Sequence, residues 1–316
     1  MSVGSKRILP HLRRRIGGIS SPSSSLAFSS STSTPSPSKD SSAWVTTEFL
    51  EDDKRIAELK LHRGPANALS LEMCQEISAA LRNLEAEKST TAVVVSSALP
   101  NKIFSAGLDI STELYKPDLD RLPEFWKSFQ QLFLDLYGSK SFTTIAAIEG
   151  PASAGGCMLA LSCDYRLMDA SPTSRGNIGL NESHLGIVAP PWMCQQYIDV
   201  VGHRQAELAL LTGLLFPPKQ ALQVGLVDEL VHGDDKGDAN VHDTAIARAK
   251  EFVRIPQGAR AAVKQLTRGP LLEKLENDRE RDVDFFCEFV TSDNTQMSLG
   301  RYLEAMAASK ASKKKK

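Results

Sequence analysis

The sequence is poor in the residues that mark secreted, metal-binding or membrane proteins. It has only five cysteines, an odd number, with neither CxxC spacing nor the pattern of a secreted disulfide framework. Its six histidines show no metal-ligand spacing, and no apolar run is long enough to span a bilayer. The net charge of −1 gives no overall basic surface for nucleic acid. We therefore expect a globular protein of a reducing compartment, without a membrane span or a nucleic-acid partner.

Acidic residues are absent before Asp40, while six lysines and arginines occur there. Residues 20–42 are mostly Ser, Thr and Pro. This composition is typical of an organellar transit peptide, and no continuous apolar core follows the basic residues as a secretory signal would require. A plain disordered tail is the alternative interpretation. We expect residues 1–42 to be a disordered transit peptide, for mitochondria or chloroplasts.

The rest of the chain has the composition of a folded protein. The 316 residues, 41% hydrophobic and 24% charged, can bury a sizeable core in one or two domains. Hydrophobic periodicity predicts strands at 56–61, 91–96, 143–148, 165–168 and 226–231, and helices at 70–87, 122–137 and 155–162. Helical patterning also covers 264–306. Strands that alternate with helices favour an α/β fold.

Two glycine-bearing turns follow strand-like runs, at 104–109 (Phe-Ser-Ala-Gly-Leu-Asp) and at 154–157 (Ala-Gly-Gly-Cys). Small residues in such turns let backbone N–H groups approach a ligand atom closely. Two N–H groups aimed at one carbonyl oxygen form an oxyanion hole. We predict that Ala106 and Gly155 supply these two donors. A ligand-free tight turn and close helix packing are the respective alternatives.

Glu182 is the candidate acid/base. It has Ile178 and Leu180 before it and Leu185 and Ile187 after it. Apolar surroundings raise the pKa of a carboxylate, which suits proton transfer near neutral pH. A solvent-exposed loop glutamate is the alternative, because most glutamates lie on the surface.

These motifs resemble those of the crotonase (enoyl-CoA hydratase/isomerase) family, and the likeness runs from about residue 46 to about residue 303. The resembling segments are 105–110, 154–157, 163–166, 178–182, 185–187, 213–218 and 221–225. The resemblance implies an α/β fold, a crotonase-like spiral of ββα units with a helical C-terminal region. Residues 43–240 would form the spiral core, 241–308 a helical region that packs homotrimers, and 309–316 a Lys-rich tail.

Within this family the chain is most similar to isomerases that move the double bond of 3-cis- or 3-trans-enoyl-CoA to the 2-trans position. The resemblance implies a role in the β-oxidation of unsaturated fatty acids in the mitochondrial matrix. It also implies fatty enoyl-CoA thioesters as substrates, with no metal and no cofactor besides the CoA of the substrate. Other crotonase-fold acyl-CoA enzymes (dienoyl-CoA isomerase, hydratase or thioesterase) and a non-catalytic RNA-binding relative are the alternatives.

The resemblance also assigns site residues. Glu182 would be the single acid/base, and the substrate would contact Ala106, Gly107, Leu108, Asp109, Ile110, Gly155 and Asn181. Hydratases of the family carry a second glutamate just after the Gly-Gly-Cys, where this chain has Met158, which favours an isomerase. His62, Arg63 and Lys264 are candidates for contacts with CoA, with exposed solvated charge as the alternative.

Overall fold

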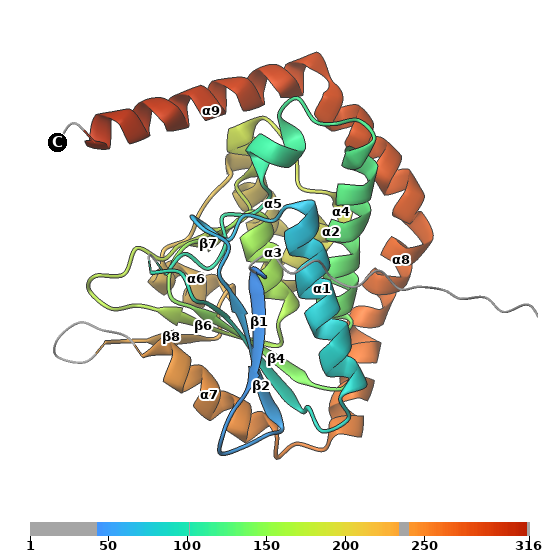
Figure 1. The fold of residues 1–316 in the computed structure, drawn as a ribbon, viewed down its shortest axis with the longest axis vertical. Coiled ribbons are helices and arrows are strands. Elements are labelled where there is room, and N and C mark those ends of the chain that lie inside the picture. The colour runs from blue at the N-terminus through green and yellow to red at the C-terminus, as the bar shows by residue number, and fades with distance from the viewer. Residues whose placement is uncertain (1–42, 101, 234–239, 315–316) are drawn as a thin grey trace, which may run out of the picture. The chain divides into compact units, whose positions relative to one another are not determined.

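The computed structural model describes residues 43–100, 102–233 and 240–314, so the predicted transit peptide at 1–42 lies outside the described residues. Its centre is a six-stranded sheet with the order β1-β2-β3-β4-β6-β8 (Figure 1). The strands are Val45–Phe49 (β1), Ile56–Leu61 (β2), Ala92–Ser97 (β3), Thr143–Ile148 (β4), Tyr165–Asp169 (β6) and Glu229–Val231 (β8). Only β1 pairs in an antiparallel manner within this sheet, and Ala152–Ser153 (β5) and Ile178–Gly179 (β7) form a second, parallel pair.

Both faces of the large sheet are covered by helices. On one face a large core contains helices Leu71–Ala86 (α1), Arg121–Tyr137 (α2) and Gly155–Ser162 (α3), and on the other lies Val241–Phe252 (α7). In β3, Val93 and Val95 belong to the large core, whereas Ala92 and Val94 pack with α7. A strand buried on both faces reads as a continuous apolar run because no position faces water.

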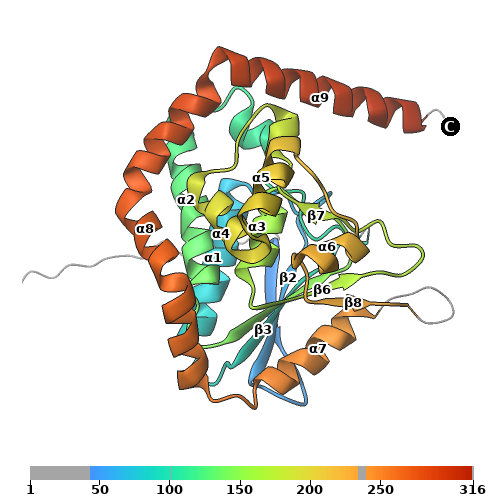
Figure 2. The ribbon, with the colours of Figure 1, turned by 180° about the vertical axis from the view of Figure 1, so that it is seen from behind.

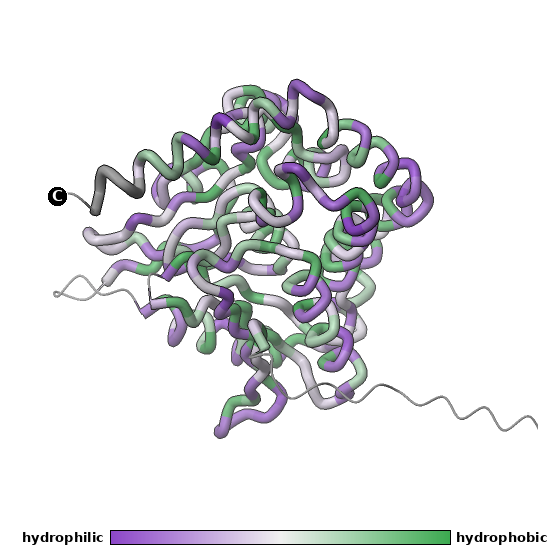
Figure 3. Tube along the Cα trace, turned by 45° about the horizontal axis from the view of Figure 1, so that its top comes forward, coloured by the Kyte–Doolittle hydropathy of each residue, from purple (hydrophilic) through white to green (hydrophobic). Residues whose placement is uncertain are grey.

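The remaining helices surround the large core. They are Pro191–Val201 (α4), His203–Thr212 (α5), Pro218–Val224 (α6), Gln257–Thr291 (α8) and Asp293–Lys314 (α9), with the short helices Ile110–Leu114 (η1) and Glu182–Leu185 (η2). Figure 2 shows that α8 runs along α2, and α9 continues from it past η1 and η2. Hydrophobic and hydrophilic residues alternate along the helical parts of the trace in Figure 3, as is typical of helices with one face on the core. No helix that the structure describes is both long and apolar enough to cross a bilayer.

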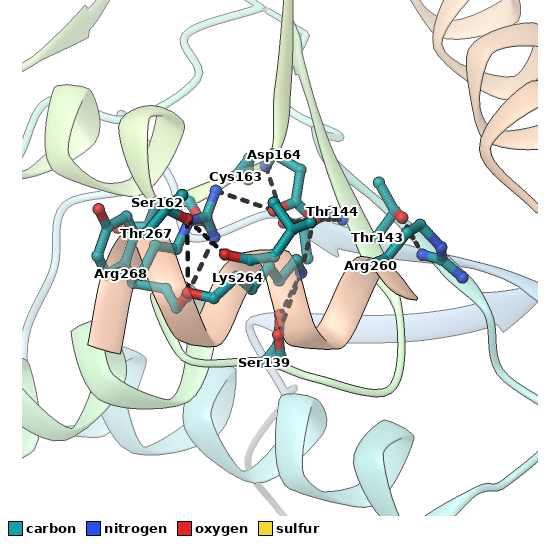
Figure 4. A network of polar contacts seen from close by, with 12 residues as sticks. Ser139, Thr143, Thr144, Ser162, Cys163, Asp164, Arg260, Lys264, Thr267 and Arg268 are labelled. Carbon is teal, nitrogen blue, oxygen red and sulfur yellow. Dashed lines mark hydrogen bonds and ion pairs between the residues drawn. The ribbon is translucent and has the colours of Figure 1, made fainter. Parts of the chain in front are cut away.

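Asp164 holds the first half of α8 against the sheet (Figure 4). Its carboxylate forms ion pairs with Lys264 at 2.7 Å and with Arg268 at 2.8 Å. Lys264 also donates to the carbonyl oxygens of Ser139 at 3.1 Å and Phe142 at 2.8 Å. Burial lowers the pKa of Lys264, against the opposing effect of Asp164. Lys264 is therefore a partly buried cation with structural partners, and its contact with CoA stays a prediction.

The α/β architecture with a helical C-terminal region confirms the predicted fold class. The predicted strand 226–231 is too long, because only Glu229–Val231 pairs with β6. Leu226 and Val227 are buried in the turn after α6, where both N–H groups donate to the carbonyl of Ala221. The strand was predicted too long because two buried apolar residues in a turn give the same hydrophobic pattern as a strand. That pattern does not show which backbone groups form hydrogen bonds.

Candidate active site

The two glycine-bearing turns lie directly against each other. A Cβ atom placed on Gly107 would lie 2.8 Å from the Gly155 nitrogen and 2.8 Å from the Ala154 Cβ. The φ angle of Gly107 is +84°, in the region that glycine tolerates best. Ser105 O also accepts the Ser153 N–H at 3.2 Å, which links the turns. Segments almost fifty residues apart thus form one backbone cluster, which requires glycine at position 107.

The second turn is strained at Ala154, which has φ +53° and ψ −123°. A non-glycine residue in such a region costs about 1–3 kcal/mol and persists only where its surroundings hold it. The Ala154 N–H donates to Gly179 O at 2.9 Å, and Ala154 O accepts the Met158 N–H at 3.1 Å. This conformation starts α3 at Gly155, whose N–H lies at the positive end of the helix and has no acceptor among the described residues.

The first turn supplies a different N–H from the one predicted. The Ala106 N–H donates to the carbonyl of Ala66 at 3.0 Å, so it is not available to a ligand, and the prediction for Ala106 requires correction. The Gly107 carbonyl accepts the Leu69 N–H at 2.8 Å. Because C=O and N–H point in opposite directions across a trans peptide, the Leu108 N–H points away from Leu69. In the described part of the chain this N–H has no hydrogen-bond partner.

Glu182 begins η2 and is only 8% exposed. Burial raises its pKa to about 7, against the effect of its own backbone N–H. Its Oε2 atom has no hydrogen-bond partner among the described residues. The preceding residue, Asn181, also has a buried side-chain oxygen without a partner there. Glu182 therefore has the burial and the pKa of a group that can take up and release a proton near neutral pH.

Glu182, Leu108 and Gly155 line one narrow cavity. Its volume is about 20 Å³, room for about one water molecule. The other walls are apolar side chains of α2, the segment after η2, α4 and α8, namely Trp126, Phe129, Ile187, Val188, Pro190, Met193, Phe286, Phe289 and Val290. Among the described residues, Glu182 is the only carboxylate that lines this cavity. A second cavity of about 440 Å³ between η2, α4 and α5 shares Glu182, Ile187 and Val188 with it.

Asp109 and Arg63 brace the first turn instead of facing the cavity. Asp109 caps η1 by accepting the Thr112 N–H at 3.2 Å, and it pairs with Arg63 at 2.6 Å. Burial would raise the pKa of Asp109, but the hydrogen bonds from Arg63, Ser111 and the Thr112 N–H, with the charge of Arg63, together lower it. The guanidinium of Arg63 also lies 4.8 Å from the ring centre of Trp44. Ile110 is the first residue of η1, and a ring nitrogen of His62 contacts the carbonyl of Ala43.

Met158 is fully buried, and it lines neither of the two cavities that Glu182 borders. Its sulfur lies 3.5 Å from the hydroxyl of Ser162, and its carbonyl accepts that hydroxyl at 2.8 Å. No cluster of three His, Cys, Asp or Glu side chains that could hold a metal ion occurs within residues 43–100, 102–233 and 240–314.

The aromatic residues of α8 were not predicted for the site. Phe286, Phe289 and Val290 reach the cavity from more than one hundred residues beyond Glu182. Their spacing along the helix is an apolar stripe, which is a visible sequence signal. The signal indicates that this face of α8 is buried, but it does not say which surface covers it.

Comparison with known proteins places the chain in a family. The model of the enoyl-CoA hydratase/isomerase family matches residues 51–310. Mitochondrial enoyl-CoA delta isomerase 1 of Rattus norvegicus is 43% identical over 260 residues, which cover 82% of this chain and 86% of the relative. The Homo sapiens protein is 40% identical over 255 residues, 81% of each chain. The crystal structure of human mitochondrial delta3-delta2-enoyl-CoA isomerase superposes with a TM-score of 0.78 at 38% identity, covering 84% of this chain and 99% of that one.

Proposed function

The chain belongs to the enoyl-CoA hydratase/isomerase family, and we propose that it moves the double bond of 3-cis- or 3-trans-enoyl-CoA to the 2-trans position. One observation carries the mechanism: within the part of the chain that the structure describes, a single buried carboxylate with a pKa of about 7 shares a narrow cavity with two backbone N–H groups that have no partner there. Relatives at about 40% identity that are named enoyl-CoA delta isomerase support the same activity.

In the proposed reaction the thioester oxygen accepts hydrogen bonds from the N–H groups of Leu108 and Gly155. These bonds stabilise the negative charge that develops when the C2 proton leaves. The carboxylate of Glu182 takes that proton, and the electron pair delocalises over the dienolate, so the double bond between C3 and C4 becomes part of the conjugated system. Protonated Glu182 then returns the proton to C4, which leaves the double bond between C2 and C3. No atom is gained or lost.

The positive end of α3 adds to the oxyanion stabilisation. Because Ala154 holds Gly155 at the first position of α3, the partial positive charge of the helix N-terminus lies beside the proposed thioester oxygen. Asn181, with its unpaired buried oxygen, is proposed to orient Glu182 or to contact the substrate.

A hydratase would need a second acid to hold and activate water. Among the described residues, Glu182 is the only acid that lines the narrow cavity. Met158 packs against Ser162 and does not line the cavity. These contacts favour proton transfer within the substrate over addition of water. They also argue against a non-catalytic role, for which a buried carboxylate without a partner would have no use.

We further propose that the protein acts in mitochondria on fatty enoyl-CoA thioesters in β-oxidation, that residues 1–42 are its transit peptide, and that it assembles as a homotrimer through residues 241–308. Relatives named mitochondrial support the location. The substrate's own CoA is the only cofactor proposed.

The test is an assay of the purified full-length chain with 3-cis- and 3-trans-hexenoyl-CoA. Formation of the conjugated 2-trans-enoyl thioester is followed by its absorbance, and its subsequent loss reports hydration. We expect isomerisation of both substrates and very slow hydration. Rapid hydration of 2-trans-hexenoyl-CoA without isomerisation would contradict the proposal.

A further inference from the structure

Asp282 of α8 binds two tryptophans and a glutamine through a single oxygen. Its Oδ2 accepts the indole N–H of Trp126 at 2.7 Å, the amide of Gln130 at 2.8 Å and the indole N–H of Trp192 at 3.2 Å. Trp126 and Gln130 lie one turn apart on α2, and Trp192 lies on α4. The carboxylate therefore ties together three helices from separate parts of the chain.

All three donors are buried, with Trp126 1%, Gln130 0% and Trp192 4% exposed. A buried N–H group without an acceptor is costly, and a charged acceptor strengthens the bond. The two indole rings lie 6.3 Å apart and each also packs against Phe129. Asp282 thus fixes the orientation of the aromatic cluster on α2 and α4 (called here the indole cluster: Trp126, Phe129 and Trp192).

The indole cluster continues into the wall of the narrow cavity. Trp126 and Phe129 line the cavity directly. Phe286 lies one turn after Asp282 on α8, and its ring stacks on Trp126 with centroids 3.5 Å apart and planes 6° apart. Phe286, Phe289 and Val290 form the α8 side of the same cavity. The bond from Asp282 to Trp126 therefore holds the α8 wall against the α2 wall.

The hydrogen bond between Asp282 and Trp126 matters for substrate binding because the cavity beside it has a volume of only about 20 Å³. The larger cavity beside Glu182 already has about 440 Å³, so the restraint acts on an acyl chain that enters the narrow cavity, whose walls have to separate to admit it. We propose that Asp282 is a positioning residue that sets which acyl-chain lengths the site accepts, because it restrains the separation of α8 from α2 and α4. This inference rests on the proposed isomerase function. Asp282 lines neither cavity that borders Glu182.

The experiment compares kcat/KM for 3-trans-hexenoyl-CoA and 3-trans-dodecenoyl-CoA in the wild type, Asp282→Ala and Asp282→Asn. We expect Asp282→Ala to raise the ratio of long-chain to short-chain kcat/KM by about tenfold, the scale on which hydrophobic pockets discriminate chain length. The kcat for the short substrate should stay within about threefold, because Asp282 does not contact the groups that move the proton. Asp282→Asn keeps one oxygen acceptor and should lie between the two.

The matched control is Asp278→Ala. Asp278 lies one turn before Asp282 on the same helix, and both border a cavity of about 400 Å³ between α4 and α8, but Asp278 is exposed and has no hydrogen bond or ion pair in the described structure. This variant should keep the wild-type ratio. A purely electrostatic effect of removing one carboxylate from α8 would change both variants alike.

The second readout does not depend on activity. The chain has three tryptophans, so the indole N–H signals of Trp126 and Trp192 can be followed by NMR with Trp44 as the internal reference. Both signals should move and lose protection from hydrogen exchange in Asp282→Ala. A folded Asp282→Ala protein with the wild-type ratio of long-chain to short-chain kcat/KM would overturn the inference. If Asp282→Ala does not fold, Asp282→Asn decides. An unchanged kcat/KM ratio in that variant, together with shifted indole signals, would then overturn the inference. A wild type inactive on both substrates would overturn the proposed function as well.

Discussion

Gly107 and Gly155 approach so closely that a Cβ on Gly107 would lie 2.8 Å from the nitrogen of Gly155. The N–H of Gly155 and that of Leu108, which follows Gly107, are the two proposed oxyanion donors. Their relative position therefore depends on the close packing of the two backbone turns. A mutation that separates the turns should act on catalysis and on stability together.

Gly107→Ala tests this packing. The new methyl group would meet Ala154 and Gly155 at a φ of +84°, so we expect a loss of about 3 kcal/mol of unfolding free energy. Displacement of the donors should lower kcat by about 10²-fold. Denaturant unfolding and the isomerase assay measure the two effects. The control is Gly258→Ala on α8, where a Cβ meets no atom within 4 Å; equal behaviour of the two variants would show that the turns tolerate separation.

Glu182→Gln should abolish the proton shift while the fold is kept. The amide has nearly the same shape but cannot accept a proton at neutral pH, and a general base contributes about 10²–10⁴-fold to the rate. Glu207→Gln is the control, because Glu207 borders the larger cavity beside Glu182 but is half exposed and paired with Arg204. Near-normal turnover by purified Glu182→Gln would mean that another group is the base.

The pH dependence follows from the raised pKa of Glu182. The base must be ionised, so kcat/KM should fall as the pH drops through about 7 and level off above it. A profile of the free enzyme that stays flat from pH 5 to 9 would not agree with this assignment.

The same pKa predicts a stability cost of the catalytic group. A carboxyl whose folded pKa lies above its unfolded value contributes stability that is present below the unfolded pKa of 4.5 and is lost as the pH rises through about 7. One pKa unit corresponds to about 1.4 kcal/mol, so Glu182→Gln should be more stable than the wild type by about 3 kcal/mol above pH 7, and by little near pH 4.5. Parallel unfolding curves at both pH values make the comparison; a wild type that is the more stable protein at pH 8 would contradict it.

His242 at the start of α7 predicts a further loss of stability at alkaline pH, in the same direction as that of Glu182 but at a higher pH. Its ring lies 2.8 Å from buried Glu58, and the hydrogen bond with Glu58 raises the pKa of His242 to about 9. The contribution of this pair should be complete below pH 6.5 and disappear as the pH rises through about 9. Because His242 is 42% exposed, we expect about 1 kcal/mol or less. The stability difference between the wild type and His242→Gln at pH 6 and pH 10 measures it, and a difference that is equal at both values would show that the charge of His242 has no part in it.

Local sequence signals located the parts of the site but not their connections. The glycine turns and the apolar setting of Glu182 could be predicted from local sequence. Glycine indicates a flexible backbone, and the apolar neighbours of Glu182 indicate burial. The occupied N–H of Ala106 could not be predicted, since its acceptor is Ala66, forty residues earlier in the chain. In the sequence Lys264 looks like an exposed helix cation, and only the tertiary contact with Asp164 shows that it is partly buried and paired. Hydrogen-bond partners at long range are properties of the fold, which a local pattern does not contain.

The three hydrogen bonds to Asp282 also set an order of events during synthesis. Both turns and Glu182 have been synthesised once residue 182 is added, but the acceptor for the two indole N–H groups is added one hundred residues later. A nascent or truncated chain that stops before α8 would hold every group that moves the proton, yet lack the wall formed by Phe286, Phe289 and Val290. Its thioester site would be open to water. Activity is thus tied to completion of the chain, and a fragment released early should be unable to act on acyl-CoA.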